Sequence, residues 1–140
     1  MKGYLLDTDI CIFFLKDKFH LTEKIDAVGI DKCFISAITI GELLYGAEFS
    51  SDYEKHIKEV VFFEDEFTVI PVYEALRIYA KEKARLRRLG TMIADLDLLI
   101  GATAITHDLI MVTRNYKHFS KIDSIQLEDW TEKEYNEFVI

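Results

Sequence analysis

The sequence predicts an α/β fold in which a mainly parallel sheet carries helices on both faces. Short apolar segments rich in β-branched and aromatic residues alternate along the chain with longer segments of helical periodicity. This alternation is typical of parallel strands joined by crossover helices. Several of the apolar segments end directly at an acidic or polar residue, and ligands in such folds bind beyond the carboxyl ends of the strands.

One domain is expected to account for the whole chain of 140 residues, half of which are hydrophobic. A domain of this size buries about two thirds of its unfolded surface, so a single core is sufficient. One proline and six glycines leave no obvious linker, and no segment is repeated or of low complexity. We therefore predict a single domain over residues 1–140, in which residues 131–140 form a C-terminal tail without an assigned role.

The first half of the chain begins with a predicted strand over residues 3–6 and helices over about 9–16 and 21–28. A turn precedes a second strand over residues 33–37. Thr39 and Glu42 match the capping box T-x-x-E, which predicts the start of a helix carrying apolar residues at helical spacing. Ser50, Ser51 and Asp52 then restart the helix as far as about residue 64.

The second half continues the alternation, with a predicted strand over residues 67–72. Residues 73–89 have the spacing of one long amphipathic helix, and Gly90 provides its stop signal. Residues 98–106 are nearly all apolar or small, which predicts a centrally packed helix with Asp95 as its cap. Strands are predicted over residues 109–113 and 124–127.

Four polar residues lie just beyond these apolar segments, and they are the candidate site: Asp7, Glu42, Asp97 and Asn115. Each acid taken alone is explained as a helix cap or a first-turn residue, with Asp7 capping the first helix. Together they indicate a cation-binding site, because Asp7 and Asp97 interrupt apolar runs where a buried charge is costly without a partner. A hard divalent cation such as Mg²⁺, which prefers oxygen ligands, is a suitable partner.

Other kinds of site are not indicated. The four histidines have no HxxxH or HxH spacing, so zinc is not expected and they are assigned to the surface or to packing: His20, His56, His107 and His118. Cys11 and Cys33 lack CxxC spacing and are expected to be buried free thiols. Glycine-rich phosphate loops and the GxSxG motif are absent from the sequence.

The net charge of −8 argues against a protein that coats nucleic acid non-specifically. Locally, however, residues 77–88 contain six basic residues and a single acid. This run is either a solvated helix face or a phosphate-binding surface beside the acidic site, in which Arg85, Arg87 and Arg88 contact substrate. The N-terminus turns acidic before a signal peptide develops and no apolar run is long enough for a membrane span, so a cytoplasmic protein is expected.

The same residues give a resemblance to a known family. The chain resembles the PIN-domain ribonucleases, specifically the VapC-type toxins of bacterial toxin–antitoxin pairs, over about residues 3–130. The matching blocks are LDTDICI at 6–12, ISAITIGELLYGA at 35–47, DLLIGATA at 97–104, VTRNYKHF at 112–119 and EDW at 128–130. Two departures stand out: Asn115 occupies the place of a frequent fourth acid, and residues 92–95 replace a frequent Pro-Ile-Gly stretch.

The resemblance implies a PIN-domain (Rossmann-like) α/β/α sandwich that hydrolyses RNA phosphodiester bonds with Mg²⁺, or with Mn²⁺ as a substitute. Metal ligation falls to Asp7, Asp97 and Glu42, and Asn115 joins these as a catalytic residue. Thr8 and Thr113 are implied to contact water or substrate phosphate. Transfer RNA is the implied target, and the implied partners are a VapB-type antitoxin and a second toxin subunit.

Three questions stay open at this level. A non-catalytic PIN-like protein acting through an antitoxin and operator complex fits the same sequence, and so does a metal-dependent DNA nuclease or phosphatase. The apolar helix residues are assigned either to the core or to docking surfaces for partners: Leu43, Leu44, Tyr45, Phe49, Phe62 and Phe63. Replacing Asp7 or Asp97 by Asn separates a catalytic role from a capping role.

Overall fold

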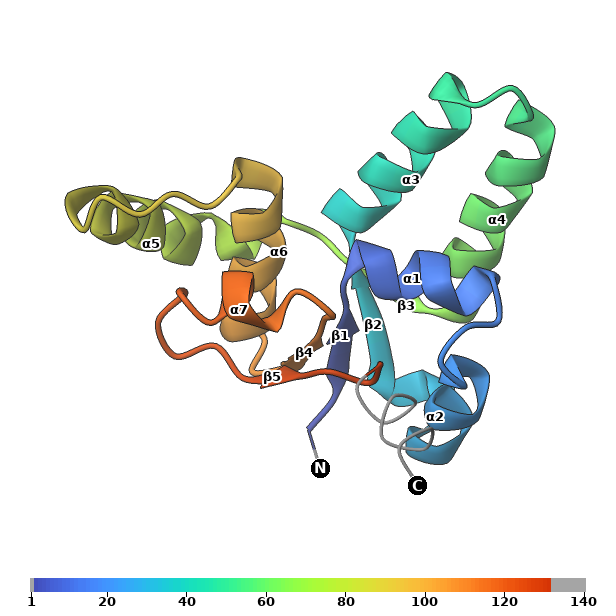
Figure 1. The fold of residues 1–140 in the computed structure, drawn as a ribbon, viewed down its shortest axis with the longest axis horizontal. Helices are drawn as coiled ribbons and strands as arrows, with labels where there is room; N and C mark the ends of the chain where they lie inside the picture. Colours follow the sequence, from blue (N-terminus) through green and yellow to red (C-terminus); the bar gives the residue numbers. More distant parts are fainter. Residues whose placement is uncertain (1, 132–140) are drawn as a thin grey trace.

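The computed structural model describes residues 2–131, which form a five-stranded parallel sheet flanked by helices (Figure 1). This confirms the predicted fold class. The strand order is β3-β2-β1-β4-β5, with β1 at the centre. The strands are β1 Tyr4–Leu6, β2 Cys33–Ser36, β3 Thr68–Ile70, β4 Ile110–Val112 and β5 Leu127–Glu128. Most of the predicted tail, residues 132–140, lies outside the described residues.

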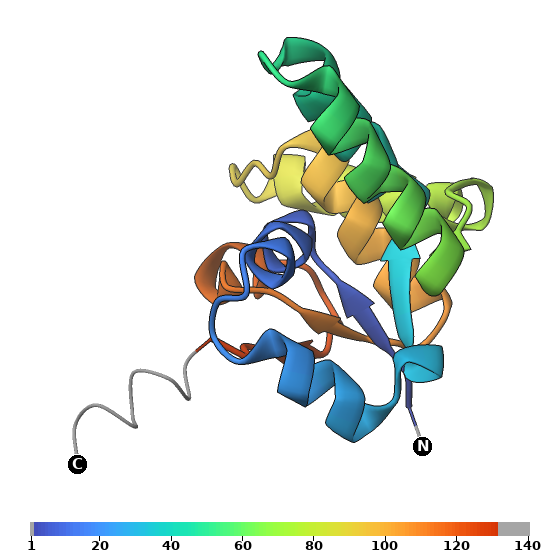
Figure 2. The ribbon, with the colours of Figure 1, turned by 90° about the vertical axis from the view of Figure 1, so that its right-hand side faces the viewer.

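The helices occupy both faces and the carboxyl edge of this sheet. Figures 1 and 2 show α3 and α4 as a paired hairpin that extends away from the sheet. Short 3₁₀ helices cover Ile30–Lys32 and Tyr73–Ala75. The α-helices are α1 Thr8–Leu15, α2 Leu21–Val28, α3 Ala37–Phe49, α4 Tyr53–Glu66, α5 Leu76–Arg88, α6 Asp95–Thr106 and α7 Tyr116–Phe119.

Side chains of the central strands alternate between two cores, as the period of a strand requires. Leu6 and Val112 belong to one core, which includes buried residues of α1, α2 and α4. Leu5 and Met111 belong to the other, with buried residues of α5, α6 and α7. Strands β1 and β4 are therefore buried on both faces, which explains why each of them is a continuous apolar run in the sequence.

All strand pairings are parallel, so the carboxyl ends lie at one edge of the sheet. Leu6 of β1 lies opposite Val112 of β4, and the N–H of Asp7 donates to the carbonyl of Val112 at 2.9 Å. This bond extends the ladder by one residue and fixes Asp7 at the point where β1 ends and α1 begins.

The helix starts differ in part from the predictions. Asp7 caps α1 as predicted, since its carboxylate accepts from the N–H of Thr8 at 2.8 Å. The capping box at Thr39 and Glu42 is wrong: α3 begins at Ala37, and Ser36 caps it by accepting from the N–H of Ile38 at 3.0 Å. An adequate cap three residues earlier lets the helix start sooner, which leaves Thr39 and Glu42 inside α3, available for other contacts.

The start of α6 also differs. Ala94 is the cap residue and Asp95 is already helical, so the predicted capping role of Asp95 is wrong. Its carboxylate instead accepts hydrogen bonds from Lys83 at 2.8 Å and from Tyr79 at 2.9 Å, which joins α6 to α5. An ion pair with a neighbouring helix leaves the carboxylate turned away from the N–H groups of its own first turn.

The remaining differences are small. The predicted helix over residues 73–89 is a 3₁₀ turn followed by α5, and the last strand is shifted to Leu127–Glu128. Helix α7 was not predicted, because four residues are too short to show a helical period. None of the helices within residues 2–131 has the length and apolar character needed to cross a membrane.

Candidate active site

Asp7 lies at the centre of the carboxyl edge and is only 6% exposed. Besides capping α1 through Oδ1, it accepts a hydrogen bond at Oδ2 from the hydroxyl of Thr113, at 2.9 Å. Thr113 directly follows β4 and is fully buried. Two elements that are far apart in the sequence therefore hold this carboxylate in one orientation.

The electrostatic surroundings of Asp7 disfavour its charge. Burial raises its pKa from 3.8 to about 6, while the hydrogen bonds from Thr113 and Thr8 act in the opposite direction. The negative charges of Asp9 and Asp97 raise the pKa further. A carboxylate that is desolvated and surrounded by like charge is one that a bound cation stabilises.

Glu42 reaches the same edge from α3. Its Oε1 accepts from the hydroxyl of Thr8 at 2.7 Å, and the hydroxyls of Thr8 and Thr39 lie 2.9 Å apart. Because the single proton of Thr8 is given to Glu42, the hydroxyl of Thr39 is the donor to Thr8. A chain of hydroxyls from the buried Thr39 thus positions the carboxylate of Glu42.

Asp97 enters from the first turn of α6, and it is half-buried. Its Oδ2 lies 3.3 Å from Nε2 of His118 in α7. The sequence predicts only a surface or packing role for His118, because a single histidine without ligand spacing carries no pattern. The available signal was its position in the block after β4, close to Asn115.

Asn115 lies at the same edge but contributes differently from the acids. Its backbone N–H donates to the hydroxyl of Thr113 at 3.0 Å, which helps to orient the group that holds Asp7. The residue is exposed, and within residues 2–131 its side chain has no hydrogen bond to the three carboxylates. The structure thus brings Asp7, Glu42, Asp97 and their threonines together, with Asn115 at the margin.

The donor atoms of this site suit a hard divalent cation, which takes carboxylate oxygens as ligands. Within residues 2–131, however, no three His, Cys, Asp or Glu side chains stand at the spacing of a formed metal site. Each acid has another partner: Asp7 has Thr8 and Thr113, Glu42 has Thr8, and Asp97 has His118. The residues fit a divalent metal in kind and in charge.

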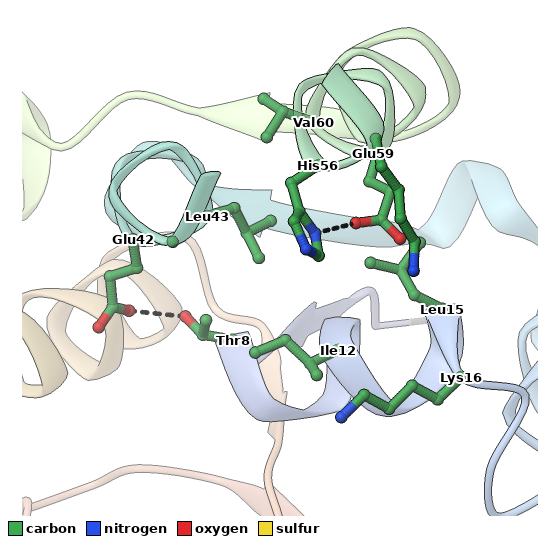
Figure 3. A pocket seen from close by; sticks show the side chains of 11 residues that line it. Thr8, Ile12, Leu15, Lys16, Glu42, Leu43, His56, Glu59 and Val60 are labelled. Carbon is green, nitrogen blue, oxygen red and sulfur yellow. Dashed lines mark hydrogen bonds and ion pairs between the residues drawn. The ribbon is translucent and has the colours of Figure 1, made fainter. Parts of the chain in front are cut away.

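A pocket of about 370 Å³ lies beside the acidic edge, between α1, α3 and α4 (Figure 3). It meets the candidate site at Thr8 and Glu42, whereas Asp7 and Asp97 do not line it. Its other walls combine apolar side chains with Lys16, Lys55 and a hydrogen-bonded pair of His56 and Glu59 at 2.6 Å. This composition suits a partner segment that offers apolar side chains together with an acidic group.

The basic residues of α5 fall into two groups. Arg85 donates two hydrogen bonds of 2.9 Å to the buried carboxylate of Glu82 and one of 2.8 Å to the carbonyl of Lys121. Arg87 and Arg88 are exposed. Of the three arginines predicted to contact substrate, Arg85 is therefore committed to a structural ion pair, whereas Arg87 and Arg88 are free of it.

The apolar helix residues also divide. Phe63 is fully buried, so it belongs to the core. Tyr45 and Phe49 on α3 are 68% and 81% exposed, and their rings stack at 6.0 Å between centroids. Leu44 and Phe62 are partly exposed as well, at 40% and 39%. The exposed part of the predicted surface therefore centres on Tyr45 and Phe49.

Known proteins are similar to this chain in sequence and in fold. The PIN domain family profile matches residues 4–125. The tRNA(fMet)-specific endonuclease VapC of Salmonella typhimurium is 34% identical over 93% of this chain and 99% of its own. Ribonuclease VapC1 of Haemophilus influenzae is 30% identical over 91% and 98%. A crystal structure of DNA-bound VapBC from Salmonella typhimurium superimposes with a TM-score of 0.86, at 34% identity over 93% and 99% of the two chains. The chain therefore belongs to the PIN domain family, among its VapC ribonucleases.

Proposed function

We propose that the chain is the toxin of a toxin–antitoxin pair, a divalent-metal-dependent endoribonuclease that acts on transfer RNA in the cytoplasm. Nucleases of the PIN domain family depend in general on a divalent metal. Mg²⁺, with Mn²⁺ as a substitute, is the ion that suits the carboxylates of Asp7, Asp97 and Glu42. A relative at 34% identity is named for its specificity toward tRNA(fMet), which supports transfer RNA as the substrate class.

In this proposal Asp7 and Asp97 hold the metal, and Glu42 orients the attacking water and accepts its proton. A divalent ion held by these residues would lower the pKa of water and stabilise the charge that develops on the phosphate. The water oxygen forms a bond to phosphorus, the bond to the 3′ oxygen breaks, and the 3′ oxygen takes up a proton from solvent, which leaves a 5′-phosphate and a 3′-hydroxyl. Thr8 positions Glu42, Thr113 positions Asp7, and Asn115 contacts the phosphate at the margin of the site.

The observation that carries this proposal is the state of Asp7. Its carboxylate is buried at the carboxyl end of the central strand, and its pKa is raised to about 6 by burial and by the nearby acids. A residue that served only as a helix cap would gain nothing from the neighbouring charge of Asp97. A divalent cation held by the carboxylates of Asp7 and Asp97 would remove this penalty.

Cleavage of purified total transfer RNA is the direct test. The wild-type protein, freed of antitoxin, is compared with Asp7→Asn in the presence of Mg²⁺, Mn²⁺ or EDTA, and the product ends are sequenced. The matched control is Asp65→Asn, which changes an exposed acid on α4. We expect discrete metal-dependent cuts with 5′-phosphate ends in the wild type and the control, and none from Asp7→Asn.

Two results would count against the proposal. Cleavage by folded Asp7→Asn removes the catalytic assignment of this residue. Absence of cleavage by folded wild-type protein with every metal favours a binding role, exerted through an antitoxin complex on operator DNA.

We also propose a VapB-type antitoxin and a second toxin subunit as partners. Solved relatives are complexes of toxin with antitoxin, including one bound to DNA. The pocket between α1, α3 and α4 offers apolar side chains and two lysines, Lys16 and Lys55, beside Glu42, where a partner segment would obstruct access to the site. The stacked rings of Tyr45 and Phe49 offer an exposed aromatic surface for the second subunit.

The two surfaces can be tested separately by light scattering and by co-purification with the antitoxin. Phe49→Ser should reduce the mass of the isolated toxin from dimer to monomer. The matched control is Tyr73→Ser, which removes a ring that is 80% exposed and lies outside both surfaces. Gly46→Leu fills the wall of the pocket and should weaken antitoxin binding while the dimer persists.

A further inference from the structure

His118 is the one described histidine that lies against a candidate metal ligand. It belongs to α7, immediately after β4, and its Nε2 is 3.3 Å from Oδ2 of Asp97. The imidazole packs edge-on against the ring of Phe119, with 5.2 Å between centroids and an interplanar angle of 81°. Phe119 is itself buried in the core under α6, so the ring of His118 has a defined position at the acidic edge.

The nitrogen that faces Asp97 is poorly satisfied. Nε2 of His118 is buried, yet within residues 2–131 it has no hydrogen-bond partner, although Asp97 is close enough for one. The distance is short but the direction is unsuitable for a hydrogen bond. Buried polar atoms nearly always have a partner, so an unpaired nitrogen beside a carboxylate is an indication that a further group binds there.

The geometry points to a metal. We propose that Nε2 of His118 is a ligand of the divalent ion held by Asp97, so that the site combines nitrogen and oxygen donors. This inference rests on the proposed function. Adjacent ligands of an octahedral ion, at bond lengths of about 2.1 Å, lie about 3.0 Å apart, which is close to the observed 3.3 Å.

A histidine ligand changes which ion the site prefers. Imidazole suits transition metals, whereas Mg²⁺ takes oxygen ligands almost exclusively. His118 should therefore increase the affinity of the site for Mn²⁺ relative to Mg²⁺. A carboxylate or an amide in the same place would not give this preference. The competing explanation, that His118 only neutralises Asp97 as a charged pair, predicts no contact between the ring and the ion.

The test measures metal binding directly on the full chain without RNA. Mn²⁺ is added to the wild type, and electron spin echo modulation reports coupling of the ion to a ¹⁴N nucleus, while calorimetry gives Kd for Mn²⁺ and Mg²⁺. We expect a histidine ¹⁴N signal in the wild type and its loss in His118→Ala. We also expect Kd for Mn²⁺ to rise about 10- to 100-fold and Kd for Mg²⁺ to change less than about threefold.

His107 provides a matched control. Its Nε2 is also buried without a hydrogen-bond partner, but it follows the opposite end of α6 from Asp97. His107→Ala should keep both the ¹⁴N signal and the Mn²⁺ affinity. His118→Glu guards against misfolding, because its carboxylate should restore metal affinity, without the ¹⁴N signal and with a preference shifted toward Mg²⁺.

The outcomes separate the two proposals. Mn²⁺ bound to the wild type without a ¹⁴N signal, or a signal that persists in His118→Ala, overturns the role of His118 and leaves the proposed function standing. Failure of the wild type to bind Mn²⁺ at all overturns the metal site, and the nuclease mechanism with it.

Discussion

Thr113 donates its hydroxyl to Oδ2 of Asp7 over 2.9 Å, and this bond joins the end of β4 to the end of β1. The two residues are 106 positions apart in the chain. The same hydroxyl oxygen accepts from the N–H of Asn115 at 3.0 Å. Thr113 therefore uses its donor and its acceptor at once, and the position of Asp7 depends on a residue that holds no charge.

Thr113→Val should raise the pKa of Asp7 above its value of about 6, because the hydroxyl is the largest influence that lowers it. The free energy of unfolding should fall by about 1–3 kcal/mol, since the N–H of Asn115 also loses its acceptor. Carbon-detected NMR titration of the metal-free protein measures the first effect and urea unfolding measures the second. Thr113→Ser keeps the hydroxyl and should retain the wild-type pKa. Equal pKa values in Thr113→Val and Thr113→Ser would contradict the role of this bond.

Asp7→Asn should stabilise the metal-free protein. The pKa of Asp7 is about 6 in the fold and 3.8 is its ordinary value, so the folded state holds the proton more tightly. Stability therefore falls as pH rises from about 4 to about 6, and stays lower above that window. The full pKa shift corresponds to a loss of about 3 kcal/mol in the free energy of unfolding. We expect Asp7→Asn to be about 1–2 kcal/mol more stable than the wild type at pH 7.5.

Urea unfolding in EDTA between pH 4 and pH 8 measures this gain. Asp9→Asn is the control, because it removes a nearby exposed charge and should give a much smaller effect. Addition of Mn²⁺ should then stabilise the wild type but not Asp7→Asn, since only the wild type binds the ion. A variant that is less stable than the wild type at pH 7.5 would show that the carboxylate of Asp7 is not a source of strain.

Local sequence predicted the strand ends and much of the site, because each depends on neighbours along the chain. The apolar run before Asp7 identified both β1 and the cap of α1. The capping box failed because Ser36, three residues earlier, is also a suitable cap, and α3 starts there. The hydroxyl of Thr39 instead meets that of Thr8, a residue 31 positions away, and this contact is not evident from the local sequence.

The contacts that the sequence does not reveal are those whose importance depends on burial or on partners from other elements. Arg85 looked equivalent to Arg87 and Arg88, because only the fold brings Glu82 to the N–H of Asp123 and buries it. His118 showed no ligand spacing because its neighbour, Asp97, comes from another helix. Periodicity and motifs describe single elements, so pairs that form between elements stay invisible to them.

Among the arginines of α5, Arg85 should contribute to stability, whereas Arg87 and Arg88 should contribute to RNA binding. Arg85→Ala leaves the buried Glu82 without its cation, so we expect the free energy of unfolding to fall. Arg85 holds the pKa of Glu82 below its ordinary value, so this contribution is present at neutral pH and lost as pH falls through the acidic range. Urea unfolding at pH 7 and at pH 3.5 measures it. A loss of equal size at both pH values would contradict the ion-pair explanation.

The double variant of Arg87→Ala and Arg88→Ala should keep its stability within about 0.5 kcal/mol, because both side chains are exposed. Its affinity for transfer RNA should fall, and the slope of log K against log salt should decrease by about 1.4–1.8 if each arginine contacts one phosphate. Fluorescence anisotropy in EDTA measures binding without cleavage. Unchanged affinity and slope would show that Arg87 and Arg88 do not contact the RNA and belong to an ordinary solvated helix face.

Thr8→Val should slow cleavage through Glu42. The hydroxyl of Thr8 orients Glu42 at 2.7 Å, and its loss also leaves the buried hydroxyl of Thr39 without a partner. We expect kcat to fall about 10- to 100-fold with little change in KM, and Thr8→Ser to retain most of the activity. Because Thr8 acts through Glu42, the double variant of Thr8→Val and Glu42→Gln should be no slower than Glu42→Gln alone. Additive losses in that cycle would show that Thr8 contacts the substrate directly instead of positioning Glu42.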